Sequence, residues 1–204
     1  SDALISGRKE KNCRFPLLGE SGGWVRVALD PYPAEDTTVE LTGIKATGLF
    51  YADAENGNDE WDGTADYANR NEELKKGPKK SLQAAHDAAT GDFPIVLAAP
   101  GTYNTGVATN GADETKFVRR LVASKNIGFI ATAGAGQTFI TGAADPATGG
   151  RGPDAIGGVF MAPGNNNPQF LQGFTITGCY SLAETDMDVN VNHQRGIGFC
   201  SSGF

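Results

Sequence analysis

The stretch from Tyr51 to Tyr103 decides the fold. It contains YADAENGNDEWDG (residues 51–63), GPKKSLQAAHDAATGD (77–92) and FPIVLAAPGTY (93–103). The first piece is an acidic, turn-rich segment, because its glycines, asparagines and aspartates permit tight or left-handed backbone. We therefore expect an irregular loop at the beginning of this stretch.

The second piece predicts a short helix. Ser81 is a good N-cap, and Leu82, Ala85 and Ala89 fall on one face. Gly91 stands where such a helix ends.

The third piece predicts a buried strand from Ile95 to Ala99, stopped by Pro100-Gly101. A loop, one amphipathic helix and a first buried strand suit the end of a solenoid, because an end coil has no neighbour to cover its apolar interior.

These residues resemble the N-terminal cap of secreted, pectate-lyase-like parallel β-helix proteins. The motif positions are Tyr51, Asp53, Gly57, Asp59, Gly63, Gly77-Pro78, Ser81-Leu82-Gln83-Ala84-Ala85, Gly91-Asp92 and Pro100-Gly101-Thr102-Tyr103. Looser matches follow at Asn126-Ile127, Phe139 to Gly142 and Gly173 to Gly178, so the resemblance covers roughly residues 51–204.

The resemblance implies an all-β fold: a right-handed, single-stranded parallel β-helix with an N-terminal capping helix. It indicates architecture and leaves activity open, because the family includes polysaccharide lyases, glycoside hydrolases, adhesins and surface proteins of no known activity.

Composition narrows the classes of partner. The chain has 204 residues, with 28 Gly, 10 Pro and a formal net charge of −7. This composition suits a turn-rich fold and disfavours nucleic acid, since no basic stripe replaces phosphate counterions. No apolar run reaches the length of a membrane span, and no signal peptide begins the chain. The resemblance implies a secreted or cell-surface protein, and the lack of an Asn-x-Ser/Thr acceptor favours a bacterial source.

The chain divides near residue 50. Residues 1–50 form an arm or small accessory β segment, with strands expected at Trp24–Leu29 and Thr37–Leu41. Residues 51–204 form the capped β-helix. Its apolar segments recur between Gly/Asn/Pro-rich connectors at 95–97, 127–130, 139–140, 159–161, 170–176 and 197–199.

A short repeat lies near the end of the sequence. An offset of 21 residues places Ile176 on Ile197 and Cys179 on Cys200. On successive coils the two cysteines would stand about 4.8 Å apart, within reach of a disulfide. Stacked reduced thiols, a disulfide that leaves Cys13 unpaired, and a metal site all stay open.

The acidic loop is the candidate metal site. Asp53, Asn58, Asp59 and Asp62, with Glu55 beside them, supply the oxygen ligands that calcium prefers. They lack the regular Asp-x-Asp-x-Asp-Gly pattern, so a loop whose side chains cap their own backbone is the competing interpretation. No other cofactor is indicated.

Catalytic candidates do not form a recognisable constellation. Asp186 and Asp188 could act as an acid and base pair, but an exposed loop is the simpler interpretation. Neither His86 nor His193 belongs to a triad or metal motif, and Ser201-Ser202 has no nucleophile-elbow context. Four aromatic residues could stack on sugars or pack loops: Trp24, Trp61, Tyr67 and Tyr180.

Two functions remain. The first is an extracellular structural or assembly protein, such as a surface-layer, adhesin or filament subunit that self-associates head-to-tail. The second is the N-terminal fragment of a polysaccharide lyase or glycoside hydrolase whose active-site coils lie beyond Phe204. The expected partners are other copies of the chain or further coils, and a polysaccharide.

Overall fold

The computed structural model describes residues 48–110, 117–161 and 169–181, together with the backbone of five further strands. These strands are β1 (Leu4–Ile5), β2 (Cys13–Arg14), β3 (Leu17–Ser21), β4 (Trp24–Val27) and β15 (Phe199–Ser201). Strands dominate the described residues, and α1 (Leu82–Ala88) is the only α-helix among them. The fold is therefore broadly all-β, as the sequence predicts.

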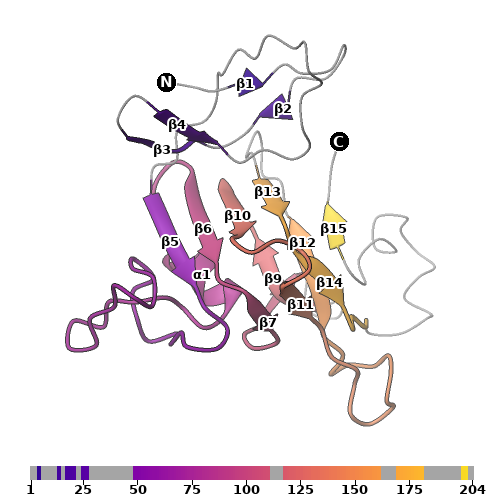
Figure 1. Ribbon diagram of the computed structural model, residues 1–204. Coiled ribbons are helices and arrows are strands. Elements are labelled where there is room, and N and C mark those ends of the chain that lie inside the picture. Colours follow the sequence, from indigo (N-terminus) through magenta and orange to yellow (C-terminus); the bar gives the residue numbers. More distant parts are fainter. Residues whose placement is uncertain are drawn as a thin grey trace.

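Three sheets of mainly parallel strands form the body of the molecule (Figure 1). The first sheet contains β5 (Gly48–Ala52), β6 (Pro94–Ala98), β10 (Ile127–Ala131) and β13 (Gln169–Gln172). The second contains β7 (Gly101–Tyr103), β11 (Thr138–Thr141) and β14 (Thr175–Thr177). The third contains β8 (Ala108–Asn110), β9 (Phe117–Ala123), β12 (Gly157–Met161) and β15.

The chain visits the three sheets in the same order each time. It runs through β6, β7 and β9, then β10, β11 and β12, then β13, β14 and β15. We call each such passage a circuit. Every strand of a later circuit pairs in parallel with its counterpart in the circuit before. The topology is thus a stack of three circuits, and within the described strands of these three sheets only β8 pairs antiparallel, with β9.

The observed repeat corrects the predicted 21-residue offset. Ile176 pairs with Ile140, 36 positions earlier in the chain. Cys200 lies on β15 of the third sheet and pairs with Phe160, whereas Cys179 follows β14 of the second sheet. Cys179 and Cys200 are therefore not at equivalent positions, because one full circuit crosses three sheets and needs more residues than the short repeat supplies.

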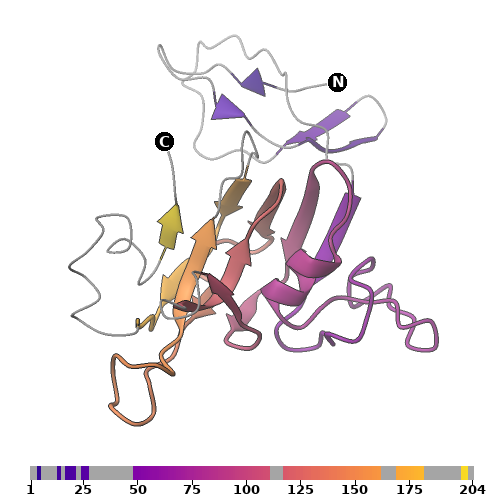
Figure 2. The ribbon, with the colours of Figure 1, turned by 180° about the vertical axis from the view of Figure 1, so that it is seen from behind.

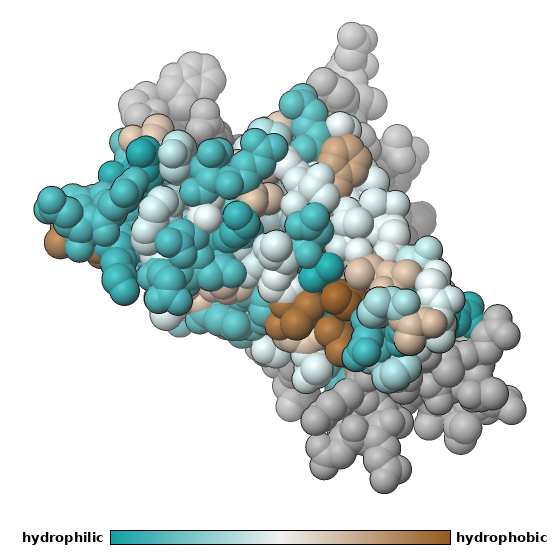
Figure 3. Space-filling view, turned by 90° about the horizontal axis from the view of Figure 1, so that it is seen from below, coloured by the Kyte–Doolittle hydropathy of each residue, from teal (hydrophilic) through white to brown (hydrophobic). Residues whose placement is uncertain are grey.

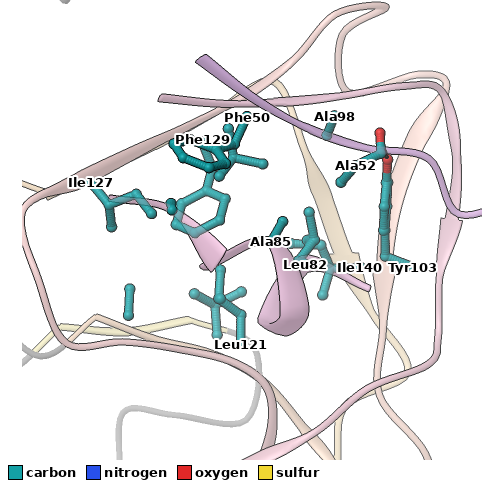
Figure 4. Close-up of a cluster of buried hydrophobic side chains, with 14 of the residues drawn as sticks. Phe50, Ala52, Leu82, Ala85, Ala98, Tyr103, Leu121, Ile127, Phe129 and Ile140 are labelled. Carbon is teal, nitrogen blue, oxygen red and sulfur yellow. Dashed lines mark hydrogen bonds between the residues drawn. The ribbon is translucent and has the colours of Figure 1, made fainter. Parts of the chain in front are cut away.

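One apolar core lies between the three sheets (Figure 4). Each sheet contributes a column of side chains that come from paired positions of successive strands. The columns run Phe50, Val96, Phe129 in the first sheet; Tyr103, Ile140 in the second; and Leu121, Val159 in the third. All of these side chains are buried, so the stack holds a continuous interior.

Helix α1 covers this core at the end formed by the first circuit. Leu82 and Ala85 are buried in the core cluster, and the helix packs against β5, β6 and β9 (Figure 2). Ser81 is the N-cap, as predicted, and its hydroxyl accepts a hydrogen bond from the Ala84 amide at 3.1 Å. The predicted cap helix is confirmed.

The other predicted strands are confirmed to differing extents. The strand expected at Ile95–Ala99 is β6, which begins and ends one residue earlier. The expected apolar segments also contain β10, β11, β12, β13 and β14. β4 confirms the first N-terminal strand and pairs antiparallel with β3, while Thr37–Leu41 lies outside the described residues. β5 begins at Gly48, so the stack includes residues before Tyr51. β9 was not predicted.

Candidate functional site

The acidic loop uses its carboxylates to bind backbone amides. Asp53 Oδ1 accepts hydrogen bonds from the amides of Glu55 and Asn56, at 3.0 and 2.9 Å. Asn58 Oδ1 accepts from the Glu60 amide at 2.9 Å. Asp53 is buried, so its carboxylate organises the turn that follows β5.

Asp59 joins the loop to the start of α1. Its Oδ1 accepts from the amides of Lys80 and Ser81, at 2.7 and 2.8 Å, and its Oδ2 accepts from the Ser81 hydroxyl at 2.9 Å. Ser81 is itself the N-cap of α1. Asp59 therefore binds backbone amides at the start of the helix, where amides have no partner within the helix.

Asp62 closes the far side of the loop. It accepts from the Thr64 amide at 2.8 Å, the Thr64 hydroxyl at 2.9 Å and the Gly77 amide at 3.3 Å. Burial opposes ionisation of this carboxyl, but the hydrogen bonds from Thr64 and Gly77 prevail and lower its pKa. Asp62 is thereby held in its charged form.

These contacts favour the structural interpretation of the loop over the calcium interpretation. Asp53, Asp59 and Asp62 each accept hydrogen bonds from different backbone segments. Within the described residues, no group of three or more His, Cys, Asp or Glu side chains is placed to hold a metal ion. The three carboxylates are thus already engaged by backbone amides.

The same loop occupies the outer edge of β5. The Tyr51 amide donates to Gly63 O at 2.8 Å, the Lys79 amide donates to Tyr51 O at 2.9 Å, and the Asp53 amide donates to Lys79 O at 2.8 Å. Gly57 makes this approach possible, since a Cβ there would lie 2.4 Å from both Asp53 O and Lys79 O. We call this end of the stack, with its loop and α1, the closed end.

At the opposite end, no described strand pairs with the outer edge of the last strand of each sheet. β13, β14 and β15 are the outermost strands of their sheets, and all belong to the last circuit. Leu171 pairs with Phe129 and Ile176 pairs with Ile140, so both continue columns of the core. Leu171 and Ile176 are half-buried, whereas Phe129 and Ile140 have no exposed surface. Phe174 is also half-buried against the core. We call this end the open end.

Three buried charged residues were missed by the sequence analysis. Arg119 and Arg120 lie side by side on β9, and Asp145 lies in the loop between β11 and β12. Arg120 donates from Nε to Thr141 O at 2.8 Å and from Nη1 to Gly106 O at 3.3 Å. Burial lowers the pKa of Arg120.

Asp145 organises its loop as Asp53 does. Its two carboxylate oxygens accept from the amides of Ala147 and Asp154, at 2.7 and 3.0 Å. These hydrogen bonds lower its pKa. Each of the three missed residues thus has a structural partner. Two adjacent arginines in an apolar strand give no local pattern from which their burial could be predicted.

The remaining candidates divide between described and undescribed residues. Cys179 carries a free thiol whose pKa is raised by burial, and His86 is buried in α1. Tyr67 lies under the Arg70 guanidinium, 4.0 Å from its ring centroid. Asp186, Asp188, His193, Ser202 and the side chains of Trp24, Cys200 and Ser201 lie outside the described residues.

The visible surface is mainly polar. Figure 3 shows a largely hydrophilic face with small hydrophobic patches. Among the described residues, the most exposed large apolar side chains are Leu74 and Val107, at 73% and 47%. In that part of the chain, no helix is both long enough and apolar enough to cross a membrane.

Comparison with known proteins identifies no relative. No family model, curated protein or solved structure matches the sequence.

Proposed function

We propose that this chain forms a right-handed parallel β-helix and serves as a self-associating structural subunit of an extracellular or cell-surface assembly. The observation that carries the proposal is the contrast between the closed end and the open end. One end has the edge of β5 and the core covered, whereas at the other end no described strand covers the edges of β13, β14 and β15, which lie around half-buried apolar side chains.

The right-handed sense follows from general chirality. Parallel strands joined by a crossover are almost always connected right-handedly, because the twist of the strands favours that return path. The three circuits consist of such parallel pairs, with one strand per sheet in each circuit. The order of sheets and the apolar columns are those expected of a β-helix.

The open end favours further β structure as its partner. An unpaired strand edge presents N–H and C=O groups that another strand can bind. Covering Leu171 and Ile176 would also remove apolar surface from water. Both gains come together when another circuit of strands is added to the three edges.

The contact in our proposal is head-to-tail between copies. The closed end cannot offer the edge of β5 at Tyr51, because the loop already binds it. The strands must come from elsewhere in the neighbouring copy, and residues 1–50 carry β1, β2, β3 and β4. Such a heterologous contact need not close, so it generates a filament.

The same open end would accept further circuits of a longer polypeptide. In that case the chain is the opening part of a larger β-helix, such as a polysaccharide lyase or glycoside hydrolase. The three sheet edges support both self-association and continuation in a longer polypeptide. Measuring whether the isolated chain associates distinguishes the two.

The test is the concentration dependence of the molecular mass of the chain, measured by light scattering and followed by electron microscopy. We expect association that Ile176→Lys reduces strongly, since a charge on the open end opposes strand addition. Leu74→Lys is the matched control, because Leu74 is 73% exposed and lies before α1, away from the open end. Deletion of residues 1–47 should also abolish association.

A monomer at high concentration, unaffected by any of these changes, would contradict the filament. Association that Ile176→Lys leaves intact would place the contact elsewhere on the surface.

A further inference from the structure

Side chains of α1 accept hydrogen bonds from the amide of Val122, near the end of β9, and from that of Ser124, just after the strand. β8 pairs only with the beginning of β9, from Phe117 to Arg119. Further along, the Val122 amide donates to Gln83 Oε1 at 2.8 Å, and the Ser124 amide donates to His86 Nε2 at 3.2 Å. Two side chains of the cap helix therefore hold it on β9.

The contact with Ser124 determines which nitrogen of His86 carries the proton. Because Nε2 accepts a hydrogen bond, the neutral ring must be protonated at Nδ1. Nδ1 lies 2.7 Å from Asp87 Oδ1, which is an acceptor well placed for that proton. Gln83 Nε2 lies 3.3 Å from His86 Nδ1 and 2.9 Å from Asp87 Oδ1, so with Nδ1 protonated it donates to the carboxylate, which organises both side chains.

Two charged groups face His86. Asp87 belongs to α1 and favours the imidazolium, whereas Lys125 follows β9 and opposes it. The Lys125 ammonium donates to Ala89 O at the end of α1, which keeps this positive charge beside the helix. His86 is only 5% exposed, so solvent screens these interactions weakly.

We propose that the hydrogen bond between Ser124 and His86 holds the cap helix on β9 in a pH-sensitive way. This hydrogen bond breaks when His86 takes up a second proton. Protonation of Nε2 converts the acceptor into a donor that faces the Ser124 N–H. The imidazolium then has no acceptor in that direction, and the Ser124 amide loses its partner. The hydrogen bond from Val122 to Gln83 remains, so α1 loosens first at its C-terminal half.

The sign of the pH dependence follows from burial. Burial is the main cause that lowers the pKa of His86 below its ordinary value of 6.5. The unfolded chain therefore binds the proton more readily than the folded chain. The stabilisation is fully present above the ordinary value and is lost as pH falls through the lowered pKa.

Nuclear magnetic resonance on the full chain tests this proposal. At about pH 7.5, the ¹⁵N shifts of His86 should identify the Nδ1–H tautomer, since this is above its unperturbed pKa. As the pH is lowered until the His86 shifts report the imidazolium, the exchange protection of the Ser124 amide, corrected for the intrinsic rate, should fall about tenfold, as expected for one lost buried hydrogen bond. The Val122 amide should lose less protection.

Two variants isolate the imidazole. His86→Gln places a neutral amide oxygen near the position of Nε2, so Ser124 protection should become independent of pH over this range. Asp87→Asn keeps the titratable ring but removes the carboxylate that favours its charged form, so the loss should move to lower pH. Neither variant touches the open end, so the result does not depend on the proposed assembly.

The Nε2–H tautomer at neutral pH would overturn the proposal. So would Ser124 protection that stays unchanged while the His86 imidazole becomes charged, or that falls equally in His86→Gln.

Discussion

The two ends of the stack finish the same sheets in different ways. At the closed end, the loop after β5 binds the outer edge of that strand, and α1 covers the core. At the open end, the corresponding positions on β13 and β14 hold half-buried Leu171 and Ile176. A parallel stack needs a cap at each end, because its interior and its strand edges are otherwise exposed. The comparison teaches that cap formation depends on residues outside the repeating strands.

The largest expected effect is a loss of stability, and it differs between two isoleucines of the same column, one in the interior and one at the open end. Ile140→Ala should cost about 2–5 kcal/mol of unfolding free energy, because the side chain is fully buried. Ile176→Ala, at the paired position of the open end, should cost about half as much or less, since its side chain already meets water. Denaturant unfolding of the two variants at low protein concentration measures both. Equal losses would mean that the open end is as well covered as the interior.

The next effect concerns the hydrogen bonds that build the closed end. Asp59→Ala leaves the Lys80 and Ser81 amides without their acceptor, and should cost about 1–3 kcal/mol. Asp59→Asn is the control, because its amide oxygen can still accept from both. Thermal unfolding should therefore rank the two variants clearly. If Asp59→Asn proved as unstable as Asp59→Ala, the negative charge rather than the hydrogen bonds would be what stabilises the cap.

Calcium should have little effect on the closed end. Asp53, Asp59 and Asp62 already accept backbone hydrogen bonds, so a cation would have to displace them. We expect weak calcium binding at most in calorimetric titration. Submicromolar affinity that disappears in both Asp59→Ala and Asp62→Ala would show that the loop is a calcium site after all.

The smallest expected effect is the acid dependence of the loop. The pKa of Asp62 is below its ordinary value of 3.8, so its contribution to stability is present above that value and is lost as pH falls below it. Because Asp62 is largely solvent-exposed, we expect a contribution of less than about 1 kcal/mol. The pH profile of unfolding should flatten slightly in Asp62→Asn. An unchanged profile would assign the acid dependence to other carboxyl groups, with Asp145 as the first to test.

Local sequence signals were sufficient for α1 and for the first buried strand, β6. Ser81, the apolar face of α1 and Gly91 describe a short capped helix without reference to the rest of the chain, because capping and helix periodicity act over a few residues. The apolar segment of β6 and its stop at Pro100-Gly101 are local in the same sense. The general fold class followed from these signals and from the resemblance that they carry.

Tertiary structure alone decided the pairing. The 21-residue offset of Cys179 and Cys200 looked like a repeat, but strands in a stack align by the length of a whole circuit, including loops of unequal length. β9 was missed because Arg119 and Arg120 interrupt its apolar pattern, and their burial depends on Thr141, Gly106 and other groups distant in sequence. The partners of the loop carboxylates are likewise set by folding, since Asp59 reaches Ser81 across 22 positions. Helix and turn signals are short-range and are written in adjacent residues, whereas strand pairing and buried polar contacts arise only when distant segments meet.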